Sequence, residues 1–456
     1  MQRCLGILFF FMCTMLLGCA PSAADVAPTG VTTENLTAGE AARFIRGGLL
    51  FQFEEFHGND RTCGDCHRPL SFFDLSPQDV QSIHQIDADN PLFRPLDSND
   101  GVGNDYSDMI NDGLVRVHVV LAPNVTVDDV DGVNVSIRPD GRYVVALRRS
   151  TPTVLNVGLE QHLMWDGREG ADLAHQALSA AIDHAQVTQT PTASQLSDIA
   201  FFQRQLFSSS TLASYAHGGA EPVLPAGRND SEERGHAFFV SGPLSAAAGT
   251  HGLCATCHSG PMLNRTNAFN PGDPPDLAFS GNRISEFNPR GMPTHTYHIT
   301  AATDLLNDNP VLGPLGSVMY PQGTVFTLTT PDPGALVVDT DPSDGSDGPA
   351  NPCISMTACF VVPGSAVVFN RIPTLWGTAL TAPYFVDNSA ATFEDVVHHY
   401  QQFFVPTQHS MLAQAAFLES IGQVEVAAFL RDEAAALTIT EQDVTDIAAY
   451  MRYAFR

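Results

Sequence analysis

The stretch Cys63-Gly64-Asp65-Cys66-His67 has a second copy further along the chain, Cys254-Ala255-Thr256-Cys257-His258. Two thiols three residues apart, followed at once by an imidazole, are the attachment signature of a c-type haem. Each thiol can add to a vinyl group of the porphyrin, and the adjacent His then lies under the ring as the proximal iron ligand. Structural zinc is the alternative, but a site of four thiolates does not require a His after each pair. The two copies predict two covalently bound haem c groups in two related halves.

The chain is strongly acidic. Its 456 residues include 50 Asp and Glu against 22 Lys and Arg, none of which is Lys, and the formal net charge is −28. Such a surface should repel nucleic acid and anionic membrane, and it should attract basic partners such as small cytochromes. A solubility adaptation to a salty habitat explains the same charge equally well.

The first residues resemble export machinery. Residues 5–17 are an apolar run too short to span a membrane as a stable helix. The run ends in Leu16-Leu17-Gly18-Cys19, which resembles a bacterial lipobox. We therefore expect a lipoprotein signal peptide over residues 1–18, lipid on Cys19 and a tether over residues 19–38, with a non-lipidated signal peptide as the alternative. This predicts a protein exported to the periplasm or cell surface and anchored there by lipid.

This interpretation assigns each of the nine cysteines a fate. Cys4 and Cys13 leave with the signal peptide, Cys19 takes lipid and four cysteines take haem. Cys353 and Cys359 remain, and in an exported protein a pair this close is expected to form a local disulfide.

Apolar residues at helical spacing precede each haem motif, over residues 41–56 and 232–240. Pro139-Asp140-Gly141 predicts the turn of a hairpin that joins residues 133–137 to 143–145. Thr440 followed by Asp443 predicts the capping box of a last helix that packs on the second haem domain.

Two haem domains are expected, over residues 39–221 and 229–456, with a Pro/Gly-rich linker at 222–228 between them. Residues 331–352 are acidic and of low complexity, so we interpret them as a surface insertion.

Two further stretches point to a family. One runs from Arg149-Ser150-Thr151-Pro152-Thr153 to Met164-Trp165-Asp166-Gly167-Arg168, and the other from Arg371-Ile372-Pro373-Thr374-Leu375 to Leu380-Thr381-Ala382-Pro383-Tyr384-Phe385. Together with the two haem motifs they resemble the bacterial di-haem cytochrome c peroxidase and MauG family, over roughly residues 41–453. The resemblance implies a mainly α fold, with two cytochrome c-like haem domains packed across an interdomain seam. An irregular, β-containing insertion is expected in the N-terminal half.

The resemblance also implies roles for residues at the seam. Trp165 matches the family tryptophan that lies between the haems and passes electrons or holes. A calcium ion would take oxygen ligands from Ser150, Thr381 and Pro383, the last through its carbonyl. The family usually has Asn where this chain has Ser150.

The resemblance makes the two irons unequal. Priming-dependent peroxidases close the first iron with a His that would fall near Arg142, and this chain has no His between His118 and Arg149. The haem on His67 is therefore predicted to be five-coordinate and open. Tyr400 stands where those peroxidases have a Met and where MauG has Tyr, so Tyr400 is the predicted second ligand of the iron on His258. His398 or His399 could ligate instead.

Peroxide cleavage also needs a group that moves a proton near the open iron. The family Glu corresponds to Gln186, which cannot titrate, and Asp183 or His184 could replace it, with His184 preferred. Gln176 matches a distal-pocket Gln that donates hydrogen bonds or positions water.

The expected function is oxidation by hydrogen peroxide at the N-terminal haem, with oxidising equivalents shared through Trp165 with the second haem. The reductant would be residues of a partner protein, as with MauG. A cytochrome c peroxidase that uses a small electron-transfer protein is the first alternative. A non-catalytic electron-transfer cytochrome and a di-haem dioxygenase stay open.

Overall fold

The structure is a computed structural model, and it describes residues 36–242, 252–267, 279–283, 292–302, 305–308, 317–334 and 367–456. The predicted signal peptide, the lipid site Cys19, most of the tether and the Cys353–Cys359 disulfide lie outside the described residues. None of the helices in the described ranges is long and apolar enough to cross a membrane.

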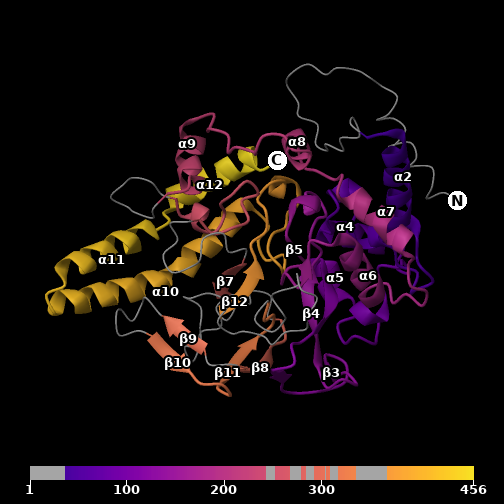
Figure 1. Cartoon of the computed structure of the whole chain (residues 1–456), viewed down its shortest axis with the longest axis horizontal. Coiled ribbons are helices and arrows are strands. Elements are labelled where there is room, and N and C mark those ends of the chain that lie inside the picture. Colours follow the sequence, from indigo (N-terminus) through magenta and orange to yellow (C-terminus); the bar gives the residue numbers. More distant parts are fainter. Residues whose placement is uncertain are drawn as a thin grey trace.

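A first helical group, on the right of Figure 1, is built on the crossing of α2 (Ala38–Phe53) with α7 (Ala193–Gln203). Capping boxes begin both helices, at Thr37 and Thr192, and satisfy backbone N–H groups there. The helices touch at Gly47, where an added Cβ would lie 2.8 Å from Cβ of Phe202. The close approach therefore requires glycine. The group also contains α3 (Cys63–Cys66), α4 (Pro77–Ile86), α5 (Ser107–Asp112), α6 (Leu173–Asp183) and α8 (Ser210–Ala216).

The prediction of a helix over residues 41–56 is confirmed by α2, but its apolar residues do not share one buried face. Phe44 and Phe51 are buried. Ile45 and Leu49 are 46% and 49% exposed. Gly47 rather than a large apolar side chain completes the buried face.

A second helical group is built on the crossing of α9 (Asp230–His236) with α12 (Glu441–Ala454). A Cβ on Gly235 would lie 2.8 Å from Cβ of Tyr450. The predicted capping box of Thr440 and Asp443 is present at the start of α12. The long helix α10 (Phe393–Ser420) and its antiparallel neighbour α11 (Val424–Ala436) extend to the left from this group (Figure 1).

The two crossings repeat the same sequence pattern. Asp198-Ile199-Ala200 lies at the first and Asp446-Ile447-Ala448 at the second. Asp198 accepts a hydrogen bond from Nε of Arg46 at 3.0 Å, and Asp446 accepts one from Nε of Arg234 at 2.6 Å. In each half the Arg directly precedes the glycine of the crossing. The helices before and after each haem motif therefore pack in one repeated way.

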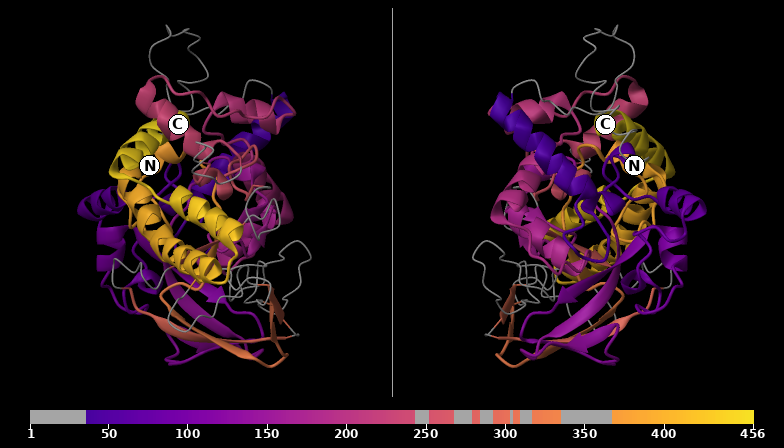
Figure 2. Two further views of the ribbon diagram at one scale, coloured as in Figure 1. Left: turned by 90° about the vertical axis from the view of Figure 1, so that its left-hand side faces the viewer. Right: turned by 90° about the vertical axis from the view of Figure 1, so that its right-hand side faces the viewer.

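A β layer lies beneath the helices, as both views of Figure 2 show. The predicted hairpin is confirmed, since Val135 pairs with Val145 across a turn in which Gly141 has φ of 87°. One three-stranded sheet has the order β1 (Leu114–Val120), β4 (Tyr143–Ser150), β3 (Val135–Ile137), and another has the order β11 (Val325–Thr330), β8 (His295–Thr300), β2 (Val125–Val127). Two-stranded sheets pair β10 (Ser317–Tyr320) with β9 (Leu305–Asp308), β12 (Val367–Arg371) with β7 (Phe279–Arg283), and β5 (His162–Leu163) with β6 (Glu169–Gly170).

The expected β-containing insertion in the N-terminal half is present as β1 to β4, but the expectation of a mainly α fold is too simple. The fold is mixed, and β8 and β11 come from the segment after the second haem motif. They pair with β2 of the first half, so that Ile299 lies opposite Val125. Tyr297 and Phe326 are buried in the same core as Val125. Pro and Gly residues are frequent in this segment, and they obscure the alternating pattern by which strands are predicted from sequence.

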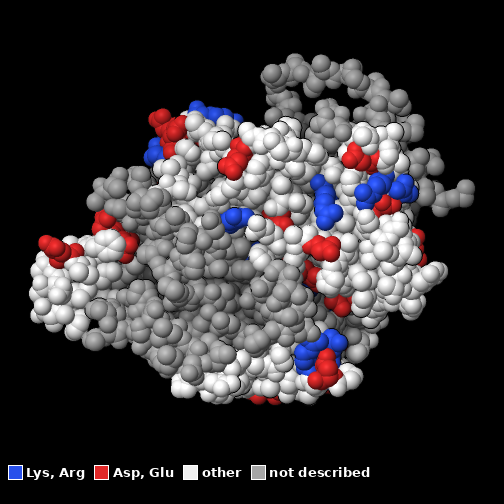
Figure 3. Space-filling view, viewed as in Figure 1, with Lys and Arg blue, Asp and Glu red and all other residues white. Residues whose placement is uncertain are grey.

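The surface carries charges of both signs. On the face shown in Figure 3, arginine side chains lie beside aspartate and glutamate side chains at several places. An ion pair joins α12 to α10, where Arg452 donates to Glu394.

Candidate functional site

The first motif forms the short helix α3, and His67 follows it as the C-cap. Nδ1 of His67 lies 3.1 Å from the carbonyl oxygen of Phe73, and the ring lies against that of Phe51, with centroids 5.8 Å apart. Phe73 has a φ of 61°, a left-handed conformation that aims its carbonyl back at the His. A hydrogen bond from Nδ1 leaves Nε2 to bind a metal, as in histidines that ligate iron or zinc.

The second motif repeats this geometry. Nδ1 of His258 lies 2.8 Å from the carbonyl oxygen of Leu263, which has a φ of 53°. Burial lowers the pKa of His258 to about 4, so its imidazole is neutral at pH 7. A neutral, oriented imidazole directly after two thiols is the donor that a haem iron requires.

The thiols of both motifs are poor candidates for a zinc or redox site. Burial raises the pKa of Cys63, Cys66 and Cys254 to about 12, so none of them is a thiolate at neutral pH. Within the described ranges, no group of three or more His, Cys, Asp or Glu residues could hold a metal ion. The described residues therefore offer no ready-made zinc site at either motif.

A cavity of about 430 Å³ opens beside the second motif. Its wall contains Cys254, Cys257 and His258 together with Tyr400 and His399 of α10. Burial raises the pKa of the Tyr400 phenol, with smaller contributions from Cys257 and Cys254, so the phenol lies in the environment of the two thiols. Apolar side chains from α10 and α12 form much of the remaining wall: Phe393, Val396, Val397, Ile447 and Met451.

The three candidates for the second ligand differ in place. His398 lies 3.1 Å from Gln401, its side chain is 41% exposed, and it is not part of the cavity wall. Both His399 and Tyr400 line the cavity, and their rings lie 5.3 Å apart. Burial lowers the pKa of His399 to about 4. The geometry therefore favours Tyr400 or His399 over His398.

The cavity wall also contains buried polar atoms. Four buried atoms in its wall have no hydrogen-bond partner among the described residues: Thr151 Oγ1, Glu160 Oε1, Asn370 Oδ1 and Arg371 Nη1. Nη1 of Arg371 lies 2.9 Å from Glu160 Oε2, as an ion pair without hydrogen-bond alignment. Arg371 Nη1 and the Thr151 hydroxyl can donate, whereas the Glu160 and Asn370 oxygens accept, and such buried polar atoms are costly unless a ligand or water satisfies them. A cavity that combines apolar side chains, His258 and two buried donors can accept a porphyrin and a propionate, although the Glu160 carboxylate would repel a propionate placed next to it.

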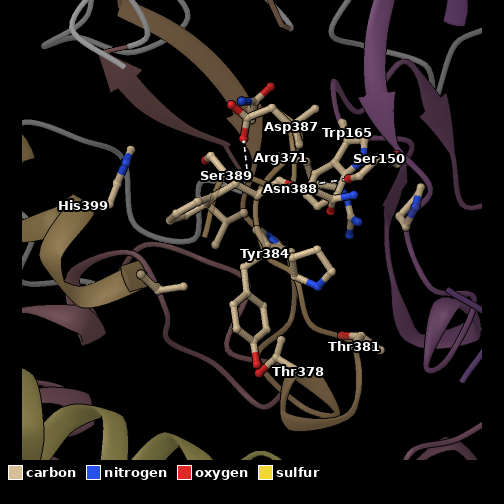
Figure 4. A pocket seen from close by; sticks show the side chains of 18 of the residues that line it. Ser150, Trp165, Arg371, Thr378, Thr381, Tyr384, Asp387, Asn388, Ser389 and His399 are labelled. Carbon is tan, nitrogen blue, oxygen red and sulfur yellow. Dashed lines mark hydrogen bonds between the residues drawn. The ribbon is translucent and has the colours of Figure 1, made fainter. Parts of the chain in front are cut away.

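Trp165 joins the two halves at the wall of this cavity (Figure 4). Its indole Nε1 donates to the carbonyl oxygen of Ser150 at 2.9 Å, on β4. Its own carbonyl accepts from the backbone N–H of Arg371 at 3.0 Å, on β12. The second tryptophan, Trp376, packs in the C-terminal core with its ring edge-on to Phe455. Trp376 meets both halves as well, since its carbonyl accepts from Nδ2 of Asn156 at 3.0 Å. The proposed relay role of Trp165 therefore depends on its motif and not on these contacts.

The predicted calcium ligands Ser150, Thr381 and Pro383 line the same cavity. Ser150 is engaged, since its hydroxyl donates to the carbonyl of Phe385 at 3.1 Å. Calcium usually needs six to eight oxygen ligands, and these three residues provide only part of such a set. Calcium therefore stays a prediction.

The predicted acid–base residues lie on and after α6. Nε2 of Gln176 lies 3.9 Å from the sulfur of Met164, next to Trp165 in sequence. Gln186 is exposed, and its side-chain oxygen accepts from Asn59 at 3.3 Å. Neither residue is part of the cavity wall at the second motif.

His184 shares surroundings with the first motif. Burial lowers its pKa to about 4, and the charges of Asp97 and Arg61 act on it. The same two charges act on the thiol of Cys66. Burial raises the pKa of Asp183. His184 is thus neutral at pH 7, and its charged neighbours Asp97 and Arg61 are also those of Cys66.

Sequence reasoning assigned no role to Arg371, although it begins one of the quoted motifs. Its backbone holds Trp165, its Nε donates to the carbonyl of Met164 at 3.1 Å, and its Nη1 faces the cavity. The one available signal was that an Arg begins both Pro-Thr-containing motifs.

Comparison with known proteins gives little further information. No protein-family model and no curated protein matches the sequence. Among solved structures, the chain is similar to one described as a MauG-like protein associated with microbial copper homeostasis. The identity is 18%, the TM-score is 0.40, and the match covers 96% of this chain and 95% of the other. A likeness at this level assigns no function, so the interpretation depends on the site itself.

Proposed function

We propose that the protein is an exported di-haem c-type cytochrome that reacts with hydrogen peroxide at the His67 site and shares oxidising equivalents through Trp165 with the His258 site. The observation that carries this proposal is the duplicated histidine geometry. His67 and His258 each follow a partly buried pair of cysteines, and each has Nδ1 at a backbone carbonyl. Bound haem would supply redox-active iron at both sites.

The chain's own residues give the two sites different tasks. At the second site Tyr400 or His399 can close the iron, and a hard phenolate from Tyr400 would stabilise its oxidised state. At the first site the neutral imidazole of His184 is the candidate to relay a proton, although its lowered pKa makes it a weak base, and Gln176 can hold water or peroxide by a hydrogen bond. This division supports a MauG-like oxidation of a partner protein over a simple cytochrome c peroxidase.

The cellular setting belongs to the same proposal. We propose export to the periplasm or cell surface with a lipid anchor on Cys19, because covalent haem attachment to this motif occurs outside the cytoplasm. The electron source would be a protein substrate or a small electron-transfer protein. If that partner is basic, the net charge of −28 would attract it.

The test is stoichiometric peroxide added to the full-length diferric protein, monitored by optical spectra and electron paramagnetic resonance. We expect a resting high-spin signal from the first site, a low-spin signal from the second, and a long-lived oxidised state with near-infrared absorption. Replacing Cys63 and Cys66 by Ala should abolish the high-spin signal and the peroxide response. The matched pair Cys254→Ala and Cys257→Ala should instead abolish the low-spin signal.

Resting protein without a high-spin ferric signal would contradict the open first iron and favour an electron-transfer cytochrome. Stable dioxygen binding without a spectral response to peroxide would favour a dioxygenase. Rapid decay of the oxidised state would favour the cytochrome c peroxidase alternative.

A further inference from the structure

Asp332 is a buried carboxylate from the segment that the sequence predicted to be a surface insertion. It follows β11 and is 5% exposed. Its two oxygens accept hydrogen bonds from Arg149, at 2.7 Å from Nε and 2.8 Å from Nη2. The backbone N–H of Gly334 donates to Oδ1 at 2.9 Å and fixes the carboxylate orientation. This two-point pairing of a guanidinium with a carboxylate is the strongest geometry available to such a pair.

Arg149 connects Asp332 to Trp165. Its remaining nitrogen, Nη1, donates to Asp166 at 2.6 Å. The next residue, Ser150, accepts the indole N–H of Trp165 through its carbonyl. Residues 149–150 and 165–166 are thus joined twice, once by an ion pair and once by the indole hydrogen bond. The orientation of Arg149, set by Asp332, therefore bears on the position of Trp165.

The cluster is neutral and has almost no contact with water. It contains the guanidiniums of Arg149 and Arg168 and the carboxylates of Asp166 and Asp332. The Arg149 side chain is 2% exposed and that of Asp166 is fully buried. Burial opposes ionisation of Asp166, but Arg168 and Arg149 hold its pKa well below the usual range. Loss of the Asp332 charge would leave one net positive charge in this buried cluster beside Trp165.

The hydrogen bond of the indole determines which kind of oxidised Trp165 can form. A peptide carbonyl is too weak a base to accept the indole proton, so Trp165 would lose one electron and keep that proton. The electron would pass to the oxidised first site, and one electron from the second site would restore the indole. An oxidised indole that keeps its proton carries a positive charge, which a nearby unpaired guanidinium destabilises.

We propose that Asp332 is a positioning residue for electron transfer through Trp165: it holds Arg149 against Asp166 and cancels a positive charge that would oppose oxidation of the indole. This inference rests on the proposed function. It assigns the insertion after the second haem motif a part in the relay between the sites.

The experiment compares Asp332→Asn with Asp140→Asn in the full-length, haem-loaded protein. Asp140 lies in the β3–β4 turn with a side chain 42% exposed, so its replacement makes the same charge change at the surface. Asp332→Asn should slow formation of the shared oxidised state after peroxide by about tenfold or more, since an unpaired charge close by in a protein interior has at least this effect. Equal rates in the two variants would overturn the proposal.

A second measurement reports position without turnover. In a Trp376→Phe background, ultraviolet resonance Raman spectra report the hydrogen bond of the Trp165 indole alone. Asp332→Asn should alter that signature and Asp140→Asn should not. If Asp332→Asn does not fold, the charge-neutral double variant Arg149→Gln with Asp332→Asn replaces it, and an unaltered indole signature there overturns the proposal. If the wild type forms no shared oxidised state, the proposed function fails, and the indole signature alone decides whether Asp332 positions Trp165.

Discussion

Gly47→Ala should destabilise the protein because two helices touch at this residue. The new Cβ would lie 2.6 Å from the carbonyl carbon of Asp198 and 2.8 Å from Cβ of Phe202, and the Asp198 oxygen is nearer still. Two of these atoms belong to backbone and one to a buried side chain, so α2 and α7 must separate.

The magnitude follows from two opposing effects. Overpacking a close contact costs about 1–3 kcal/mol, and contact with backbone favours the upper end of that range. Alanine in place of glycine regains about 1 kcal/mol of helix propensity. The net loss should be about 1–2 kcal/mol. Gly39→Ala is the matched control, because it lies in the same helix with no atom within 4 Å of the added Cβ.

Thermal unfolding of the haem-loaded protein measures the difference, and Gly39→Ala should unfold at or slightly above the wild-type temperature. Absorbance should also change selectively. Phe51 of α2 contacts His67, so Gly47→Ala should alter the spectrum of the first haem, while Gly235→Ala should alter that of the second. If Gly47→Ala and Gly39→Ala unfold at the same temperature, the helix crossing does not depend on glycine and the reasoning is refuted.

Two further predictions concern ionisation and ligation. Burial raises the pKa of Asp74 to about 8. The folded protein therefore keeps a proton that the unfolded chain releases above about pH 4. The free energy of unfolding should fall between pH 4 and pH 8 by up to about 5 kcal/mol. Asp74→Asn should flatten the pH dependence of the melting temperature, and an unchanged slope would contradict the assignment. Tyr400→Phe should change the low-spin spectrum while the cavity-lining control Met451→Leu should not; if only His399→Leu changes it, His399 is the ligand.

Local signals in the sequence predicted much of the fold. The capping box at Thr440, the hairpin turn at Gly141 and the helix before the first motif are all present. Each depends on hydrogen bonds or backbone conformations within a few residues, which a short stretch of sequence specifies. The haem motifs belong to this class, because the Cys and His residues that act together are consecutive.

Contacts between distant segments were not predictable in this way. Nothing near Val325–Thr330 indicates that β11 lies in a sheet with β2, two hundred residues earlier in the first half. Asp332 lies in an acidic, Pro-rich stretch, and such stretches are usually solvated. The burial of Asp332 depends on its ion pair with Arg149. Arg149 already pairs with Asp166 of its own segment, and Asp332 is the second carboxylate that it contacts.

The repeat explains why the two sites resemble each other in framework and differ in chemistry. Gly47 and Gly235 fix matching helix crossings, and His67 and His258 are oriented by matching carbonyls. These features need only backbone geometry and small residues, so they can be duplicated without regard to function.

The side chains that would face each iron come instead from the helix that follows each Pro-Thr motif, and these two helices differ. The helix α10 carries Tyr400, which can bind iron. Its counterpart α6 contains no Tyr or Met, and its one His, His175, pairs with Glu169 at 2.8 Å. The asymmetry between an open and a closed iron would therefore arise from these two helices within an otherwise repeated framework.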